Sequence, residues 1–189
     1  VAPDGVTFYI SDTAGNRVRK VSAGGVISTV AGNGTAAAAG DNGAGTSAQL
    51  SAYGLGVAAN GDLYIADAVN NRIRRLAATA GVITGASIIT TVAGTGTAGS
   101  SGGSGPATAA TLNGPNGVAV LAGGAIVIAD TGNHTVRRID SGVITTAVGT
   151  AGSACPASSS LCGDLGSAAA ALLNAPLTVA ADGAGGFLI

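Results

Sequence analysis

The sequence predicts an all-β protein, a β-propeller built from four-stranded blades, and three repeated features lead to this prediction. One phrase, an apolar strand followed by an aspartate and basic residues, occurs three times, as "FYISDTAGNRVRKV", "LYIADAVNNRIRRL" and "IVIADTGNHTVRRID". A second phrase with a leucine recurs at a similar spacing of about 60 residues, at Leu50, Leu112 and Leu173. Gly is abundant and Glu is absent, which favours short strands and turns over long helices. A fixed period of this size is typical of repeat architectures.

Each repeat divides into four strands in the same order. The first is "GVAA" (56–59) or "GVAV" (117–120), and the second is "LYIAD" (63–67) or "IVIAD" (126–130). The third carries the arginines, and the fourth reads "VISTVAG", "IITTVAG" or "VITTAVG". The second strand is apolar on both faces, whereas a strand with one wet face alternates with polar residues. A blade with a neighbour on each side explains this pattern.

The repeat spacing divides the chain, as one domain spanning 1–189, into units at about 1–55, 56–116 and 117–176, with a half unit at 177–189. We therefore expect about three and a half blades, a fragment of a larger ring, because propellers have roughly 4–8 blades. Blades without a neighbour leave strand edges and apolar faces open, which predicts self-association through the open blade ends. A small closed ring whose last blade is shared by the two termini is the alternative.

The repeats "GVAVLAGGAIVIADTGNHTVRRI" and "GVAANGDLYIADAVNNRIRRL" resemble NHL repeats. The Gly-rich segment "TVAGTGTAGSSGGSGPATAATLNGP" is similar to the linker of a teneurin-like extracellular subgroup. The resemblance covers nearly the whole chain and implies a six-bladed propeller. It implies no single activity, because NHL propellers serve as protein-binding modules, RNA-binding modules, sensor ectodomains and, in a few cases, enzymes.

A turn motif of Asp and Asn follows the second strand of each unit. We expect the aspartate to accept a hydrogen bond from a backbone amide two residues on, in an Asx-turn, and the asparagine to take the left-handed conformation of a tight turn. The same residues in every blade indicate a structural role, since a catalytic site needs different residues in one place. The motif comprises Asp12, Asn16, Asp67, Asn71, Asp130 and Asn133, the last of which is followed by His134 where the other units have Asn.

All eight basic residues lie in the third strands or directly before them, and they form a predicted basic belt. The belt could bind RNA or could bridge to the turn aspartates and cover apolar neighbours. The net charge of −1 and the presence of only five aromatic residues argue against nucleic acid as a partner. The belt comprises Arg17, Arg19, Lys20, Arg72, Arg74, Arg75, Arg137 and Arg138.

The sequence offers little for catalysis or metal binding. Zinc-dependent NHL-like lyases place several histidines at the channel, whereas this chain has one, His134. Asp41 and Asp164 lie at equivalent places in two linkers, but Gly103 replaces them in the middle one. No catalytic residue, metal ligand or cofactor is predicted.

Cys155 and Cys162 lie in the third linker, and we expect them to form a disulfide, the alternative being two free thiols. A disulfide indicates an oxidising compartment, so we expect an extracellular protein or ectodomain. No apolar run reaches the roughly 18–20 residues of a membrane span. The leading functional hypothesis is a non-enzymatic scaffold for an unknown protein or small-molecule ligand. The alternatives are an NHL-like propeller enzyme (a lyase or hydrolase) whose catalytic residues lie outside this segment and, more weakly, an RNA-binding NHL domain.

Overall fold

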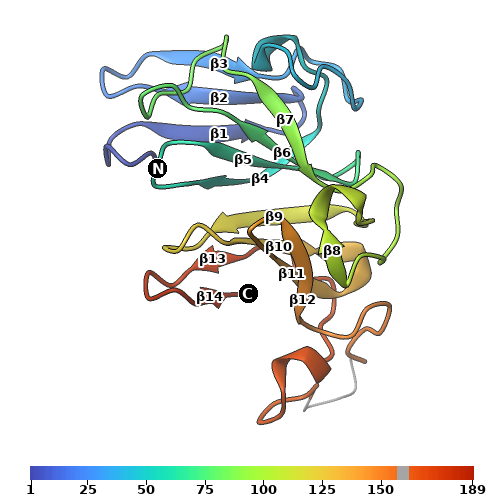
Figure 1. The fold of residues 1–189 in the computed structure, drawn as a ribbon. Coiled ribbons are helices and arrows are strands. Elements are labelled where there is room, and N and C mark those ends of the chain that lie inside the picture. Colours follow the sequence, from blue (N-terminus) through green and yellow to red (C-terminus); the bar gives the residue numbers. More distant parts are fainter. Residues whose placement is uncertain (157–161) are drawn as a thin grey trace.

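The computed structural model describes residues 1–156 and 162–189, and its sheets follow one another along the chain as successive blades (Figure 1). The all-β prediction is confirmed. The first blade has three strands in the order β1-β2-β3 and the second has four in the order β4-β5-β6-β7. The bounds are β1 Phe8–Asp12, β2 Arg17–Val21, β3 Ile27–Ala31, β4 Ala52–Val57, β5 Leu63–Asp67, β6 Arg72–Leu76 and β7 Ile89–Ala93.

The third blade has the same four antiparallel strands and one addition. Strand β8, from the preceding linker, pairs with the outer strand β12 and gives the order β8-β12-β11-β10-β9. The fourth unit contributes two short paired strands. The bounds are β8 Ser104–Pro106, β9 Pro115–Val120, β10 Ile126–Asp130, β11 Thr135–Asp140, β12 Val143–Val148, β13 Ala180–Ala181 and β14 Phe187–Leu188.

The innermost strands begin earlier than the sequence pattern suggested. β4 starts at Ala52, opposite Asp67, and β9 starts at Pro115, opposite Asp130. The predicted unit boundaries after residues 55 and 116 therefore fall inside β4 and β9. The first blade also lacks the innermost strand expected before Phe8, because residues 2–7 form a turn in which Asp4 accepts the amides of Val6 and Thr7.

The described residues also contain four single-turn 3₁₀ helices, three of them in the linkers. No helix in the described part of the chain is long and apolar enough to cross a membrane. The bounds of the 3₁₀ helices are η1 Gly45–Ser47, η2 Ala107–Ala109, η3 Thr131–Asn133 and η4 Ala168–Ala170.

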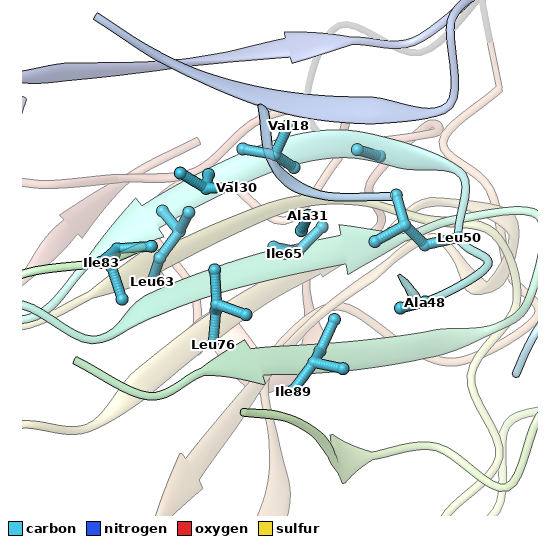
Figure 2. Close-up of a cluster of buried hydrophobic side chains, with 11 residues drawn as sticks. Val18, Val30, Ala31, Ala48, Leu50, Leu63, Ile65, Leu76, Ile83 and Ile89 are labelled. Carbon is cyan, nitrogen blue, oxygen red and sulfur yellow. The ribbon is translucent and has the colours of Figure 1, made fainter. Parts of the chain in front are cut away.

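Apolar side chains fill the space between neighbouring blades. The cluster between blades 1 and 2 joins Val18 and Val30 of the first blade to Leu63, Ile65 and others of the second (Figure 2). A second cluster joins blades 2 and 3, and a third joins blade 3 to the fourth unit. Burial on both faces of a blade explains why its second strand is apolar throughout.

Candidate functional site

The aspartate that ends β5 is fully buried and hydrogen-bonded on both oxygens. Asp67 Oδ1 accepts the backbone amide of Ser51 at 2.7 Å and Asn70 Nδ2 at 2.6 Å. Arg74 Nη1 donates to Oδ2 at 3.3 Å, and both side chains are at most 1% exposed. Burial raises the pKa of Asp67, although the Ser51 amide, Asn70 and Arg74 each act to lower it.

The aspartate that ends β10 repeats this arrangement. Asp130 accepts the amide of Asn113 at 2.8 Å and Asn133 Nδ2 at 2.7 Å, and it lies 3.6 Å from Arg137 Nη1. Burial raises the pKa of Asp130 and lowers that of Arg137. A buried charge is tolerated only when it is paired and hydrogen-bonded, and this cluster supplies both conditions.

The predicted Asx-turn is not what these two aspartates form. The backbone amides that they accept, of Ser51 and Asn113, precede them by 16 and 17 residues. Those amides follow the recurring leucines Leu50 and Leu112, so each cluster ties a hairpin to the preceding linker. The local sequence pattern could not reveal a partner so far away in the chain.

Two positions of the turn have separate roles. The fourth residue after the aspartate is left-handed in all three blades, with φ of 50° at Asn16, 52° at Asn71 and 57° at His134. The third residue binds the aspartate, as Asn70 and Asn133 do through their side chains. His134 therefore holds the place of Asn71, as the alignment of the repeats indicated, and Asn133 holds the place of Asn70.

The buried clusters also bind the linker carbonyls. In the second blade Asn70 donates to Ala37 O at 2.9 Å, and Arg74 lies 2.7 Å from Asp41 of the same linker. In the third blade Asn133 donates to Gly99 O and Arg137 to Gly102 O, at 2.7 and 2.6 Å. The asparagine and the arginine therefore hold the linker against the blade that follows it.

Asp12 of the first blade is different. Its side chain is 41% exposed, accepts the amide of Gly15 at 3.2 Å and lies 4.0 Å from Arg19. Among the residues the structure describes, it is the only one of the three carboxylates with a hydrogen bond from a backbone amide in its own hairpin. The amide is three residues on rather than the expected two.

The basic residues divide into three rows rather than one continuous belt. Arg19, Arg74 and Arg137 pair with the turn aspartates of their own blades. Arg17 and Arg72 donate to the linker carbonyls of Asn33 and Thr95. Lys20, Arg75 and Arg138 bind Ile83 O, Asp62 and Asp140, respectively.

Cys155 and Cys162 are joined by a disulfide, with Cα atoms 5.6 Å apart, as predicted. Residues 157–161 between them lie outside the described part of the chain. His134 Nδ1 accepts the amide of Ala175 at 3.0 Å, so the single histidine fixes the start of the fourth unit. Within residues 1–156 and 162–189, no three metal-ligating side chains gather.

An open groove lies where the innermost strands of successive blades meet. It has a volume of about 360 Å³ and is lined by Thr13, Tyr53, Gly54, Asn116, Leu177 and Thr178. Tyr53 on β4 and Asn116 on β9 hold equivalent positions, one residue after the strand residue opposite each buried aspartate. Leu177 follows Pro176 as Asn116 follows Pro115. Tyr53 is 41% exposed and Leu177 61% exposed.

Close backbone packing forms the wall of this groove. A Cβ added at Gly54 would lie 2.5 Å from Asn116 O, and one at Gly117 would lie 2.8 Å from Leu177 O. Only glycine permits this approach of neighbouring strands. Thr13 donates its hydroxyl to Ala52 O at the start of β4, and Thr131 donates to Pro176 O in the segment before β13. The backbone of the wall is thus fixed by glycine and threonine.

This groove was not predicted from the sequence. The threonine after the aspartate in "SDT" and "ADT" was a visible signal, because it recurs in two of the three units. The residues between it and the glycines differ from unit to unit and carry no repeat signal. Their position could be found only once the innermost strands had been placed next to one another.

The fold and the repeated cluster define the protein as a propeller-type repeat protein. Residues 112–139, which include β9, β10 and the buried Asp130, match the NHL repeat model. Over these residues the chain is similar to the NHL repeat family. No curated protein matches the chain by sequence.

Several solved structures share the fold. A protein of unknown function from Bacteroides thetaiotaomicron matches with a TM-score of 0.71 and 18% identity, over 99% of this chain and 42% of that one. An auxiliary nutrient binding protein from the same organism matches with a TM-score of 0.62 and 15% identity, over 92% of this chain and 40% of that one. A streptogramin B lyase matches with a TM-score of 0.54 and 14% identity, over 96% of this chain and 43% of that one. This chain therefore spans less than half the length of these proteins, and the likeness shows the fold alone.

Proposed function

We propose that the protein is a non-enzymatic binding scaffold whose groove at the innermost strands receives a protein or small-molecule ligand. One observation carries the proposal. Equivalent positions on β4, on β9 and in the segment before β13 bear Tyr53, Asn116 and Leu177 on a wall of tightly packed backbone, and Tyr53 and Leu177 are exposed. A rigid wall with variable exposed groups is the arrangement that binding proteins use to place contacts.

The charged groups of the repeat support this reading. The carboxylates of Asp67 and Asp130 are buried and hydrogen-bonded within the fold, and each basic side chain has a partner in the protein. For Arg74 and Arg137, which are buried against their carboxylates, binding of an RNA phosphate would compete with these contacts. The fold does not decide between binding and catalysis, because it is shared by proteins called a nutrient binding protein and a lyase.

An extracellular location is part of the proposal. The disulfide supports it, since structural disulfides persist in oxidising compartments. We also propose, from the Gly-rich linker, that the chain resembles the teneurin-like extracellular subgroup of NHL propellers. Reduction of this bond in the isolated protein should lower its stability by roughly 2–3 kcal/mol.

The test is a binding screen read at the groove. Saturation-transfer NMR with a panel of disaccharides and short peptides should identify ligands that contact the Tyr53 ring. Tyr53→Ala and Asn116→Ala should each weaken binding of such a ligand by at least about tenfold. Tyr9→Ala, which alters a tyrosine of the first blade outside the groove lining, is the control. Ligands unaffected by both groove substitutions, or converted to product, would contradict a binding role for the groove.

A further inference from the structure

A second cavity, of about 380 Å³, lies between the second and third blades, away from the groove. It is lined by the β4–β5 turn (58–60), the β9–β10 turn with its flanks (120–124) and Tyr64 of β5. The corresponding space between the first and second blades measures about 190 Å³, and no tyrosine lines it. The two junctions are built from equivalent strands, so the difference needs a cause.

The cause is the length of one loop. In the second blade, residues 77–88 connect β6 to β7, whereas in the third blade only Ser141 and Gly142 connect β11 to β12. The rest of the connection is equivalent, because Gly45 N donates to Ser87 O as Ala107 N donates to Gly142 O. The longer loop therefore adds a segment that has no counterpart in the third blade.

This segment closes the junction between blades 1 and 2. Ile83 from the loop is fully buried in the cluster between those blades, next to Leu63 (Figure 2). Its carbonyl accepts Lys20 Nζ of the first blade at 3.0 Å. Lys20 stands opposite Tyr9 on the neighbouring strand. The loop thus brings an aliphatic side chain and an oxygen acceptor to a tyrosine–cation pair.

The junction between blades 2 and 3 has the same pair without the loop. Tyr64 stands opposite Arg75, as Tyr9 stands opposite Lys20. Ile126 and Ile139, which are 7% and 5% exposed, replace the fully buried Leu63 and Leu76 of the covered junction. Tyr64 packs against the cluster that contains Ile126 and Ile139, and it also lines the larger cavity, so this cavity is the counterpart of the space beside Ile83.

Arg75 is held in position through its Nε, and its Nη groups remain available as hydrogen-bond donors. Its Nε donates to Asp62 Oδ2 at 2.7 Å, and Asn60 Nδ2 binds the same oxygen at 3.0 Å. The Arg75 side chain is 40% exposed, and within the described chain only its Nε has a recorded partner. A guanidinium fixed through Nε can present its Nη groups to an incoming oxygen.

We propose that this cavity binds a loop of a partner protein that presents a branched aliphatic side chain beside an oxygen acceptor. The protein's own Ile83 loop is the template for the occupant. The aliphatic group fills the space beside Tyr64, which packs against the cluster of Ile126 and Ile139. The acceptor oxygen binds Arg75, which stands opposite Tyr64 on the neighbouring strand. The site is separate from the groove and does not depend on the function proposed for it.

The probe is the blocked peptide TAGVITGA, residues 79–86 of this chain, titrated into the full protein and followed by amide chemical shifts. Saturable shifts at Asn60, Tyr64 and Gly123 are expected, with a dissociation constant on the order of 1 mM for so small a contact. The same peptide with Ile83→Ser should bind at least about tenfold more weakly. Arg75→Gln should weaken binding several-fold, whereas Arg72→Gln, an arginine of the same strand bound to a linker carbonyl, should leave it unchanged.

A loop graft provides the decisive variant. Replacing Ser141–Gly142 by residues 77–88 should fill the cavity, abolish peptide binding and raise the melting temperature. Tyr53→Ala should leave peptide binding intact, which separates this site from the groove. Shifts confined to the groove, equal binding of the serine peptide, or equally tight binding of 3-methylpentanoate alone would overturn the proposal, the last because it would indicate a small-acid pocket.

Discussion

The first blade and the two that follow it contain the same aspartate–arginine pair in different surroundings. Asp12 is 41% exposed and 4.0 Å from Arg19, whereas Asp67 and Asp130 are fully buried against their arginines. The strands and turns are alike apart from Gly15, which stands in the place of Asn70 and Asn133, so the larger difference lies outside the hairpin. Asp67 and Asp130 each receive an amide from the preceding linker, and no described residue packs on Asp12 in this way. The linker, not the hairpin, buries the pair.

The second and third blades differ in a smaller respect. Arg74 faces two carboxylates, Asp67 and Asp41, at 3.3 and 2.7 Å. Arg137 faces only Asp130 in the described chain, because Gly103 stands where the other linker has Asp41. Equivalent substitutions in the three blades should therefore have graded effects.

The largest effect is expected for Asp130→Ala. It leaves Arg137 buried without a carboxylate, and breaking a buried ion pair in this way costs about 3–5 kcal/mol. Urea unfolding measures the change. Asp140→Ala is the control, since that aspartate is 64% exposed and pairs with Arg138 at the surface. Equal effects of the two substitutions would show that burial of the pair is unimportant.

A smaller effect is expected for Asp67→Ala. The substitution removes the bonds to Ser51 and Asn70, but Asp41 still neutralises Arg74. The cost should be about 1–3 kcal/mol, that of unsatisfied polar groups without an unpaired charge. The double variant Asp67→Ala with Asp41→Ala should then cost more than the two single changes together. Additivity would mean that Asp41 does not compensate.

The pH dependence should separate Asp130 from Asp62. The pKa of Asp130 is raised by burial, so the stability linked to its titration is full below the unfolded value of 3.8 and is lost as pH rises through the folded pKa. At Asp62 burial is outweighed by bonds from Ala78, Asn60 and Arg75, which lower the pKa. The stability that Asp62 contributes is present above pH 3.8 and is lost as pH falls through the folded pKa of Asp62.

Unfolding of the wild type and of the two aspartate-to-asparagine variants between pH 2.5 and 7, a range chosen around the ordinary Asp pKa of about 3.9, tests these signs. The stability difference between wild type and Asp130→Asn should shrink as pH rises. The difference for Asp62→Asn should shrink as pH falls below 3.8. Profiles of the same sign would contradict the assignment.

The repeats made the fold predictable, because apolar strands, turn residues and period all reflect local geometry. The disulfide was also readable, since two cysteines share one short linker. The contacts of Asp67 and Asp130 could not be predicted, because their partners Ser51 and Asn113 are distant in the chain and donate only backbone amides. The groove residues Tyr53 and Asn116 carry no repeat signal at all. Both features arise from contacts between units, which a single repeat does not encode.

A modest gain in stability is expected from Gly103→Asp, which gives the third blade a carboxylate equivalent to Asp41 of the second. A Cβ at this position meets no atom within 4 Å, and the glycine is not left-handed. Pairing with Arg137 from an exposed position should stabilise the protein by about 0.5–1 kcal/mol. The gain should diminish in about 1 M salt, where exposed charges are screened. A loss of stability, or a gain that salt does not change, would show that the new carboxylate does not pair.

The smallest effect is expected for Asp12→Ala in the first blade. Asp12 has one amide bond, from Gly15 at 3.2 Å, and its arginine is 4.0 Å away and itself 30% exposed. Water can replace both contacts, so the cost should stay within about 0.5–1 kcal/mol, the range of surface ion pairs. The measurement is the same urea unfolding as for Asp130→Ala. If Asp12→Ala cost as much as Asp67→Ala, the energy of the pair would come from its own hairpin, and the role assigned to the linker would be wrong.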